Sequence, residues 1–374
     1  MRVMATVEEM RDQALEVARG WSGPDAPPTW RLTAALFEAI ADHDDLLGAL
    51  TFLPPARLPA LLASAAIAYL ARQDTSGALG SAFPEPGSPQ PAFDEGFFDA
   101  FRGFCATHLD DIVGVCRDHR YQMNEVARST QIALGITALI AGRAAEPVAL
   151  VDLGTGAGLG LQLDRYGYRV GEREGGAPGA LRLSCEVRGG TPPAPALPPI
   201  AERIGIEVDP IDLDDPASRR WLESCVPPEA SALGRLAEAV EVARRHPVTI
   251  VAGDLVAELP GVLAALPEGR RTFVVDSYVA VFLTAEQRRR VVATLAEAGQ
   301  SRPVTWLSLD PLVPLGPSGD RSVQDLDLPD SLIDDNRTIG VFAILGARTF
   351  DGDRDESRLL ARAHPSGSWV EWLA

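Results

Sequence analysis

Short apolar runs rich in β-branched residues alternate with helical segments after Pro147, and this alternation constrains the fold most strongly. The runs are VALVDL (148–153), RIGIEV (203–208), VTIVAG (248–253), TFVVDS (272–277) and VTWLSLD (304–310). Helical patterns such as ASALGRLAEAVEVARRH (230–246) and TAEQRRRVVATLAEAG (284–299) lie between them. Strands that are apolar throughout are typical of a parallel sheet covered by helices on both faces. The sequence therefore predicts an α/β fold.

Two segments depart from this alternation. LRLSCEVRGGTPPAPALPP (181–199) is typical of an inserted strand followed by a proline-rich loop, and the role of the 168–200 insertion stays open. At the C-terminus, TIGVFAILGARTF (338–350) and SGSWVEWLA (366–374) predict two strands that close the sheet as an antiparallel pair.

The residues before the alternation have helical periodicity. Apolar side chains recur at three- and four-residue spacing in 5–19, 29–42 and 57–72, and helical patterns also cover 95–119 and 124–143. The stretch SAFPEPGSPQPAF (81–93) interrupts them as a loop. We therefore expect a helical N-terminal domain over 1–145 and a sheet domain over 146–374.

Composition narrows the possible partners. The formal net charge is −18, so the surface repels phosphate backbones and anionic lipids, and we expect neither nucleic acid nor membrane as the main partner. LPALLASAAIAYLA (58–71) is too short for a membrane span and predicts a buried helix.

The first residues contain no apolar core of a secretory signal, so we expect a cytoplasmic location. The four cysteines have no metal-ligand spacing, and we expect no metal. The oligomeric state stays open, with a homodimer as one option.

Glycine occupies every second position after the first strand, in VALVDLGTGAGLGLQLDRY (148–166). A phosphate-binding P-loop requires a lysine, and none occurs. The dinucleotide fingerprint G-x-G-x-x-G fails in both registers, because Leu159 or Leu161 stands at the third glycine position. The pattern that fits is acid-x-G-x-G-x-G, formed by Asp152, Gly154, Gly156 and Gly158. A tight turn that binds nothing is the alternative.

This pattern resembles the first motif of class I S-adenosylmethionine-dependent methyltransferases. The resemblance implies a Rossmann-like sheet that is parallel with an antiparallel C-terminal strand, capped by the helical N-terminal domain. It also implies that Glu207 binds the ribose hydroxyls, with Asp209 as a competitor, that Asp254 meets the adenine amino group, and that Asp276 lies beside the transferred methyl. Asp254 and Asp276 have helix capping as their alternative role, and the alternative for Glu207 is an ordinary solvated strand end. The chain between the glycine loop and Glu207 is longer than is usual in that superfamily.

A second resemblance spans nearly the whole chain. It is carried by QMNEVARSTQ, GLGLQLDRYGY, CEVRG, IGIEVDPIDLDDP and HPSGSWVEWL. Together these segments are similar to an uncharacterised family of methyltransferase-like proteins common in actinobacteria. Members often have histidine where this chain has Asp276, which suggests a specialised substrate.

Several polar and aromatic residues outside these motifs are further candidates. On a helix, Asn124, Arg128 and Gln131 share one face, with Glu125 beside Arg128. We expect Arg128 to bind the cofactor carboxylate and Asn124 or Glu125 to meet the cofactor's amino group or the acceptor; a capped helix start with a solvated salt bridge is the alternative. Tyr278 would point toward the acceptor, where it could orient a nucleophile or shield the sulfonium by a cation–π contact; core packing is the alternative. Tyr166 and Tyr168 are expected on a helix after the glycine loop, with core packing the commoner role, and His364 lies in a loop that could reach the site.

These residues predict an enzyme that transfers a methyl group from S-adenosylmethionine to a small-molecule acceptor. Methyl transfer needs alignment and desolvation, and a general base only where the acceptor must lose a proton. The alternatives are a non-catalytic protein that binds S-adenosylmethionine or a nucleoside, and a nicotinamide-dependent oxidoreductase, against which the failed third glycine argues.

Overall fold

The computed structural model describes residues 4–23, 26–140, 142, 146–179, 181–311, 314–315, 320–321, 326, 328–338 and 342–374. The chain divides into two compact units. A helical unit contains residues 1–124 and 212–237, and a sheet unit contains residues 125–211 and 238–374. The expected boundary after residue 145 and the expected helix end at Arg143 lie outside the described residues.

The helical unit is built from α-helices and short 3-10 turns. Its elements are α1 (Val7–Trp21), η1 (Pro28–Trp30), α2 (Arg31–Ala41), α3 (Asp44–Ala49), η2 (Pro55–Arg57), α4 (Pro59–Ala71), η3 (Gly80–Ala82), α5 (Phe97–Asp118), α7 (Pro216–Ser224) and the first half of α8 (Ala230–Arg245). The helices expected from periodicity over 5–19, 29–42, 57–72 and 95–119 are therefore present.

Helix α4 lies at the centre of this unit. It is apolar on nearly every face, which predicts a helix that is buried all round. It contacts α1, α2, α5 and α7. At the start of α1, Thr6 and Glu9 form a capping box, in which each side chain accepts a hydrogen bond from the other residue's backbone N–H.

Within the described residues, every strand lies in the sheet unit. Its elements are η4 (Val126–Arg128), α6 (Ser129–Leu139), β1 (Val148–Leu153), η5 (Gly160–Arg165), β2 (Gly167–Val170), β3 (Arg173–Gly176), β4 (Arg182–Gly189), β5 (Ile200–Glu207), β6 (Thr249–Ala252), α9 (Leu255–Ala265), β7 (Thr272–Ser277), η6 (Ala280–Phe282), α10 (Ala285–Gly299), β8 (Val304–Pro311), β9 (Pro314–Leu315), β10 (Asp320–Arg321), α11 (Asp330–Thr338), β11 (Ala343–Asp351), β12 (Arg354–Ala363) and β13 (Trp369–Trp372).

Among the described residues, eleven strands form one large, mostly parallel sheet in the order β3-β2-β4-β13-β12-β11-β8-β7-β1-β5-β6. The five strands expected from the apolar runs are β1, β5, β6, β7 and β8, and they lie next to one another in parallel. β11 runs antiparallel to both β8 and β12. The chain is thus a mixed α/β protein.

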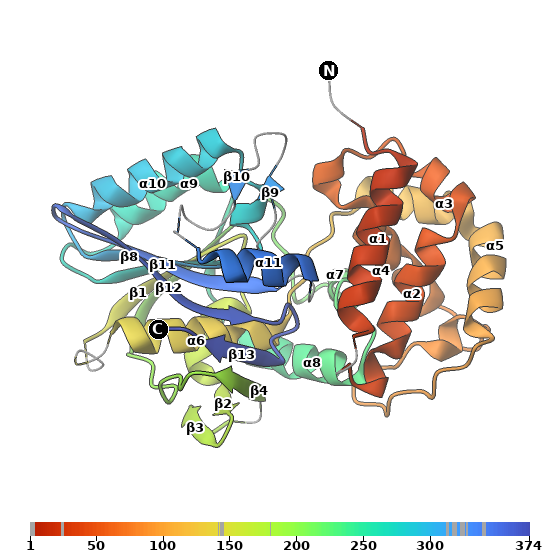
Figure 1. Cartoon of the computed structure of the whole chain (residues 1–374), viewed down its shortest axis with the longest axis horizontal. Helices are drawn as coiled ribbons and strands as arrows, with labels where there is room; N and C mark the ends of the chain where they lie inside the picture. Colours follow the sequence, from red (N-terminus) through yellow and green to blue (C-terminus); the bar gives the residue numbers. More distant parts are fainter. Residues whose placement is uncertain are drawn as a thin grey trace. The chain divides into compact units, whose positions relative to one another are not determined.

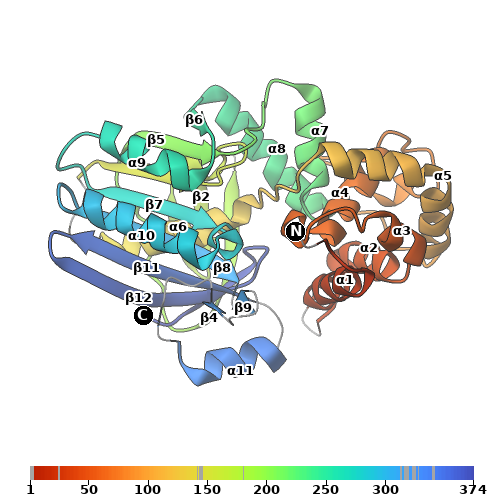
Figure 2. The ribbon, with the colours of Figure 1, turned by 90° about the horizontal axis from the view of Figure 1, so that it is seen from above.

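Helices cover both faces of this sheet. α9 and α10 lie on one face and α6 on the other (Figures 1 and 2). Each layer has its own core: Ile132, Leu150 and Leu307 belong to the α6 side, and Val151, Leu263 and Trp306 belong to the other. Alternate residues of β1 therefore serve opposite cores, as expected of a strand buried on both faces.

The C-terminal strands differ from the expected pair. The segments 338–350 and 366–374 are not neighbours, because β12 lies between β11 and β13. The first residues of β12 are polar or charged, so the sequence does not predict a strand there, and in the structure these residues are exposed. β13 pairs in parallel with β4, so the 168–200 insertion extends the sheet through β2, β3 and β4.

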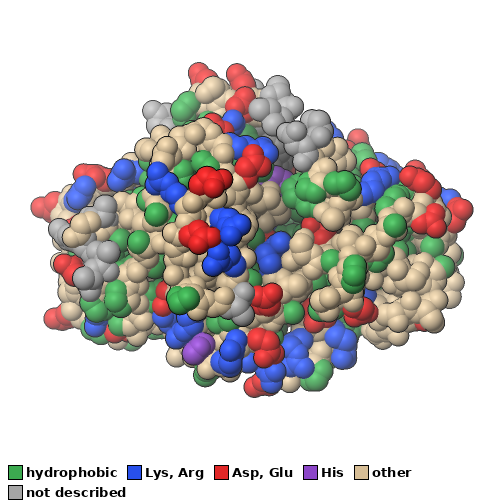
Figure 3. Space-filling view, turned by 90° about the horizontal axis from the view of Figure 1, so that it is seen from below, with side chains coloured by type: hydrophobic (Ala, Val, Ile, Leu, Met, Phe, Trp, Pro, Cys, Tyr) green, Lys and Arg blue, Asp and Glu red, His purple; other side chains and the backbone are tan. Residues whose placement is uncertain are grey.

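The surface is charged and mixed in sign. Arginine and acidic side chains are interspersed on the face that Figure 3 shows. Within the described part of the chain, no helix is long and apolar enough to cross a membrane.

Candidate functional site

The glycine loop leaves β1 and crosses the end of β5. Gly154 N donates to Ile206 O at 2.8 Å, and Gly158 N donates to Thr155 O at 3.0 Å. Gly154, Gly156 and Gly158 have φ values of +66°, +57° and +73°, in the left-handed region that favours glycine. At Gly154 a Cβ would also lie 2.6 Å from Val279 Cγ2. The alternating glycines are therefore needed for both the path of the loop and its close contact with residue 279.

Glu207 lies at the end of β5, directly against this loop. Its Oε2 accepts from Gly156 N at 2.8 Å, and its Oε1 accepts from Asp209 N at 3.2 Å. Glu207 as a whole is only 7% exposed. The structure thus brings the glycine loop together with Glu207, which the sequence predicted at the end of the second expected strand, now β5. Each carboxylate oxygen of Glu207 keeps a further lone pair.

Asp152 lies near the end of β1, beneath the glycine loop. Thr155 Oγ1 donates to Asp152 Oδ2 at 2.6 Å. Burial, together with the nearby charges of Asp276 and Glu207, raises the pKa of Asp152 to about 7, although the Thr155 hydroxyl opposes the shift. A Cβ at Gly160 would lie 2.9 Å from Asp152 Oδ2, so the fourth glycine also makes room for this carboxyl.

Asp276, at the end of β7, forms a buried acid pair with Asp310 of β8, and the two side chains are hydrogen-bonded. Burial raises the pKa of Asp276, and burial with the adjacent Asp276 charge holds the pKa of Asp310 well above its ordinary value. Two carboxyls in such contact share a proton, and their titration belongs to the pair.

Further donors fix this acid pair. Trp306 Nε1 donates to Asp276 Oδ2 at 2.7 Å, and Ser308 Oγ lies 2.6 Å from Asp310 Oδ2. Backbone N–H groups of Ala280 and Val281 donate to Asp276 and Asp310, each at 3.2 Å. The pair therefore holds the start of η6 and the segment 277–281. Sequence reasoning missed Asp310, although an acid ending an apolar run was the available signal.

Tyr278 is strained within this segment. Its φ is +62°, which is an outlier for a bulky residue, and its N–H donates to Leu309 O at 2.9 Å. The guanidinium carbon of Arg128 lies 4.0 Å from the centre of its ring, within cation–π range. Burial raises the pKa of Tyr278 above its ordinary value. Two candidates predicted from distant parts of the sequence are therefore in contact.

The segment that carries Arg128 is not the single helix we expected. Residues 121–125 are not helical, and η4 precedes α6, which begins at Ser129. Glu125 Oε1 accepts from Ala127 N at 3.0 Å and caps η4 instead of extending a helical face. The alternative of a capped helix start is therefore confirmed, but a solvated salt bridge is wrong, because both Glu125 and Arg128 are buried. Arg128 Nε donates to Pro365 O at 2.6 Å.

The other predicted residues lie as follows. Asn124 belongs to the helical unit, where its Nδ2 donates to Gln122 O at 3.1 Å. Asp254 is exposed and caps α9 by accepting from Val256 N and Ala257 N. The structure thus gives Asp254 the capping role, and contact with adenine stays a prediction. His364 Nδ1 accepts from Ser366 N at 3.1 Å, in the turn after β12.

The expected helix after the glycine loop is absent from the described residues. η5, a 3-10 helix, follows the loop, and β2 begins at Gly167. Tyr166 and Tyr168 are fully buried, and their hydroxyls donate to Leu159 O and Leu163 O. The two aromatic residues thus pack in the core, which was the commoner alternative for both.

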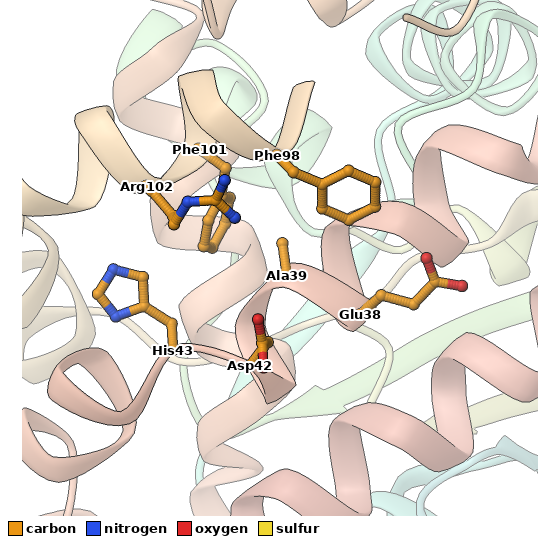
Figure 4. Close-up of a pocket in the computed structure, with 7 residues that line it drawn as sticks. All are labelled: Glu38, Ala39, Asp42, His43, Phe98, Phe101 and Arg102. Carbon is orange, nitrogen blue, oxygen red and sulfur yellow. The ribbon is translucent and has the colours of Figure 1, made fainter. Parts of the chain in front are cut away.

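We call Asp152, Glu207, Asp276 and Asp310, with the loop 154–158, the strand-end site. Its four acids stand at or near the carboxyl ends of four adjacent strands, β5, β1, β7 and β8. Elsewhere, the helical unit has a cavity of about 240 Å³, and none of the predicted site residues lines it (Figure 4). In the described part of the chain, no cluster of three His, Cys, Asp or Glu side chains is arranged to hold a metal.

Comparison with known proteins gives one clear relationship. Among curated proteins, no sequence matches the chain. The pattern of a family described as "Uncharacterized protein conserved in bacteria (DUF2332)" matches residues 16–372, nearly the whole chain. The protein that carries the strand-end site therefore belongs to the DUF2332 family.

Proposed function

We propose that the protein transfers a methyl group from S-adenosylmethionine to a small-molecule acceptor. The observation that carries the proposal is the strand-end site, in which a left-handed glycine loop is hydrogen-bonded to Glu207 and surrounded by buried acids. Open α/β sheets bind ligands at the carboxyl ends of their strands. A cofactor with a sulfonium and an ammonium group gains from nearby carboxylates.

The residues present fit this cofactor better than a dinucleotide. A pyrophosphate is held best at the N-terminus of an α-helix, whereas here a 3-10 helix follows the loop. The acids would also repel phosphate. Val208, beside Glu207, is 56% exposed and offers an apolar side chain against which an adenine ring could pack. The chemistry of the donor set therefore favours a nucleoside ligand that is cationic and has no phosphate.

The proposed roles follow from position. Glu207 would accept hydrogen bonds from the ribose hydroxyls with its remaining lone pairs, and the glycine loop would admit the cofactor close to the backbone. Arg128 would bind the cofactor carboxylate. Asp276 would hold the segment 277–281, so that Tyr278 faces the transferred methyl. In the reaction the methyl–sulfur bond breaks, a bond to the acceptor atom forms, and a neutral thioether remains; an acceptor proton, where present, leaves to a base or to water.

Calorimetric titration with S-adenosylmethionine and S-adenosylhomocysteine tests the proposal. We expect micromolar binding to the wild type and binding about tenfold weaker or more in Glu207→Gln, because the amide can accept only one of the two backbone N–H bonds. Asp42→Asn, an exposed change in the helical unit, is the control and should bind normally. A folded wild type that binds neither compound would overturn the proposal. Binding without methyl transfer to any acceptor would identify a non-catalytic binding protein.

A further inference from the structure

A cavity of about 240 Å³ lies in the helical unit, between the end of α2, the start of α3 and the first half of α5. Its floor is apolar and consists of the buried residues Ala39 and Phe101 and the half-buried Phe98. Figure 4 shows the methyl group of Ala39 between the two phenylalanine side chains, where it leaves space that a larger residue would fill. Drug-sized ligands occupy pockets of about 300–1,000 Å³, so this cavity suits a smaller molecule with an apolar body.

The charged side chains that line this cavity are paired, with one exception. Glu38 Oε2 accepts from Arg31 Nη1 at 2.8 Å. Arg102 forms an ion pair with Asp99, whose side chain does not line the cavity. In the described part of the chain, no hydrogen bond or ion pair involves the carboxylate of Asp42. The wall of the cavity therefore carries one uncompensated negative charge, at Asp42.

The position of Asp42 in the helix adds to this negative potential. Asp42 is the C-cap of α2, and its N–H donates to Glu38 O at 3.1 Å. The carboxyl end of a helix carries a partial negative charge from its unpaired carbonyls, so an acid there is unfavourable and a cation is favourable. The net charge of −18 on the chain acts in the same direction. A cation beside Asp42 would thus be stabilised by both the carboxylate and the helix end.

The basic side chains at the cavity do not provide a site for an anion. His43 Nδ1 accepts from Leu46 N at 3.3 Å, which caps the start of α3 and requires this nitrogen to be unprotonated. The imidazole is therefore neutral while the cap holds, and its proton is on Nε2. Arg102 is already neutralised by Asp99. An anion would have to compete with Asp99 and would also be repelled by Asp42.

We propose that this cavity binds a small aromatic amine in its ammonium form. The ammonium group would pair with Asp42 at the rim. The aromatic body would pack over Ala39 against Phe98 and Phe101, because aromatic rings stabilise one another in offset or edge-to-face contact. The site belongs to the helical unit and does not rest on the proposed methyl transfer.

Saturation-transfer NMR on the intact protein tests the site with benzylamine, benzyl alcohol and benzoate, which share a phenyl ring and differ in charge. Titration at neutral pH should give saturable binding of benzylamine. Benzyl alcohol should bind about threefold to fivefold more weakly, because a partly exposed ion pair contributes a modest free energy, and benzoate should bind most weakly. The proposal is overturned if benzylamine does not bind the folded protein, or if either of the other two binds as tightly.

Two charge variants locate the ammonium group. Asp42→Asn should weaken benzylamine binding about threefold to fivefold and leave the binding of benzyl alcohol unchanged. Asp45→Asn is the matched control, because it makes the same change in net charge at an exposed acid that does not line the cavity. This variant should bind benzylamine as the wild type does. Equal losses in both variants would show that benzylamine responds only to the overall charge, and would also overturn the proposal.

Ala39→Leu tests the apolar floor. The larger side chain would occupy the space between the two phenylalanine rings, so the affinities for benzylamine and benzyl alcohol should both fall about tenfold or more. Circular dichroism checks that this variant keeps the helix content of the wild type. Unchanged binding of both ligands to folded Ala39→Leu would place them outside the cavity and contradict the proposal. If leucine prevents folding, the two charge variants still decide.

Discussion

Single residues in the glycine loop have roles that differ in kind. Gly154 needs both a left-handed backbone and free space, because a Cβ would lie 2.6 Å from Val279 Cγ2. Gly352, in the turn between β11 and β12, has a φ of +60° and no atom within 4 Å of a Cβ position. The two glycines therefore separate the effect of backbone conformation from that of crowding.

For Gly154→Ala we expect the free energy of unfolding to fall by about 2–4 kcal/mol, which combines backbone strain with displacement of Val279. Gly352→Ala should lose only about 1–2 kcal/mol, from the backbone alone. Urea unfolding of the two variants and the wild type measures the difference. Equal losses would show that Val279 moves aside without cost and that contact between the loop and segment 277–281 is loose.

The raised pKa of Asp152 makes the free energy of unfolding depend on pH. Its folded-state pKa is about 7, against 3.8 as the ordinary value, so the folded protein holds a proton that the unfolded chain has released between these pH values. Stability should fall as pH rises from 4 to 7, by on the order of 4 kcal/mol in total. Asp152→Asn, which cannot ionise, should be more stable than the wild type at pH 8 and similar to it at pH 4. A constant difference between the two proteins across this range in urea unfolding would contradict the assignment.

At the scale of elements, the acid pair joins β7, β8 and the start of η6, and its two members are not equivalent. Asp276 accepts from Trp306 on one oxygen and from Ala280 on the other. An asparagine at 276 can accept on one side only. An asparagine at 310 can still accept from Val281 N, and its amide nitrogen would face Ser308, whose hydroxyl can accept instead of donating.

We therefore expect Asp276→Asn to cost about 1–3 kcal/mol more than Asp310→Asn in urea unfolding at neutral pH. The raised pKa of Asp310 adds a second consequence. The wild type loses stability as pH rises toward the folded-state pKa of this carboxyl, and Asp310→Asn should remove that part of the slope. Equal costs for the two variants would contradict the inequivalence of the two carboxyls, and a larger cost for Asp310→Asn would exchange their roles.

The parallel strands could be predicted from sequence, because each is a continuous apolar run whose register follows from burial on both faces. β12 could not, since its exposed first half has no such pattern. The helix expected after the glycine loop was wrong because the buried rings of Tyr166 and Tyr168 draw that stretch into the core. Of the strand-end site, three acids could be read from the ends of strands. The pairing of Asp276 with Asp310 and the stacking of Arg128 on Tyr278 depend on tertiary contacts that no local pattern encodes.

At the scale of the whole molecule, the helical unit is assembled from two separate stretches of chain. Residues 212–237 lie in this unit, although the chain on both sides of them belongs to the sheet unit. They supply Trp221 and Cys225 to the core of the N-terminal helices. Glu229 Oε1 also accepts from Trp21 Nε1 at 2.9 Å and from Thr33 Oγ1 at 3.2 Å. An N-terminal domain that ends near residue 145 therefore lacks part of its own core.

This organisation predicts that residues 1–124 do not fold alone. The isolated fragment should show no cooperative melting by circular dichroism. It should also bind a hydrophobic dye, because the apolar side chains that pack against Trp221 in the intact chain would be exposed in the fragment. Joining residues 124 and 212 through a flexible linker, to give 1–124 followed by 212–237, should restore a cooperative transition. Trp221→Ala in that fusion should remove about 3–5 kcal/mol, the usual cost of a buried tryptophan. The prediction is contradicted if the 1–124 fragment melts cooperatively and is as stable as the fusion. Residues 212–237 would then not be needed for the core of the helical unit.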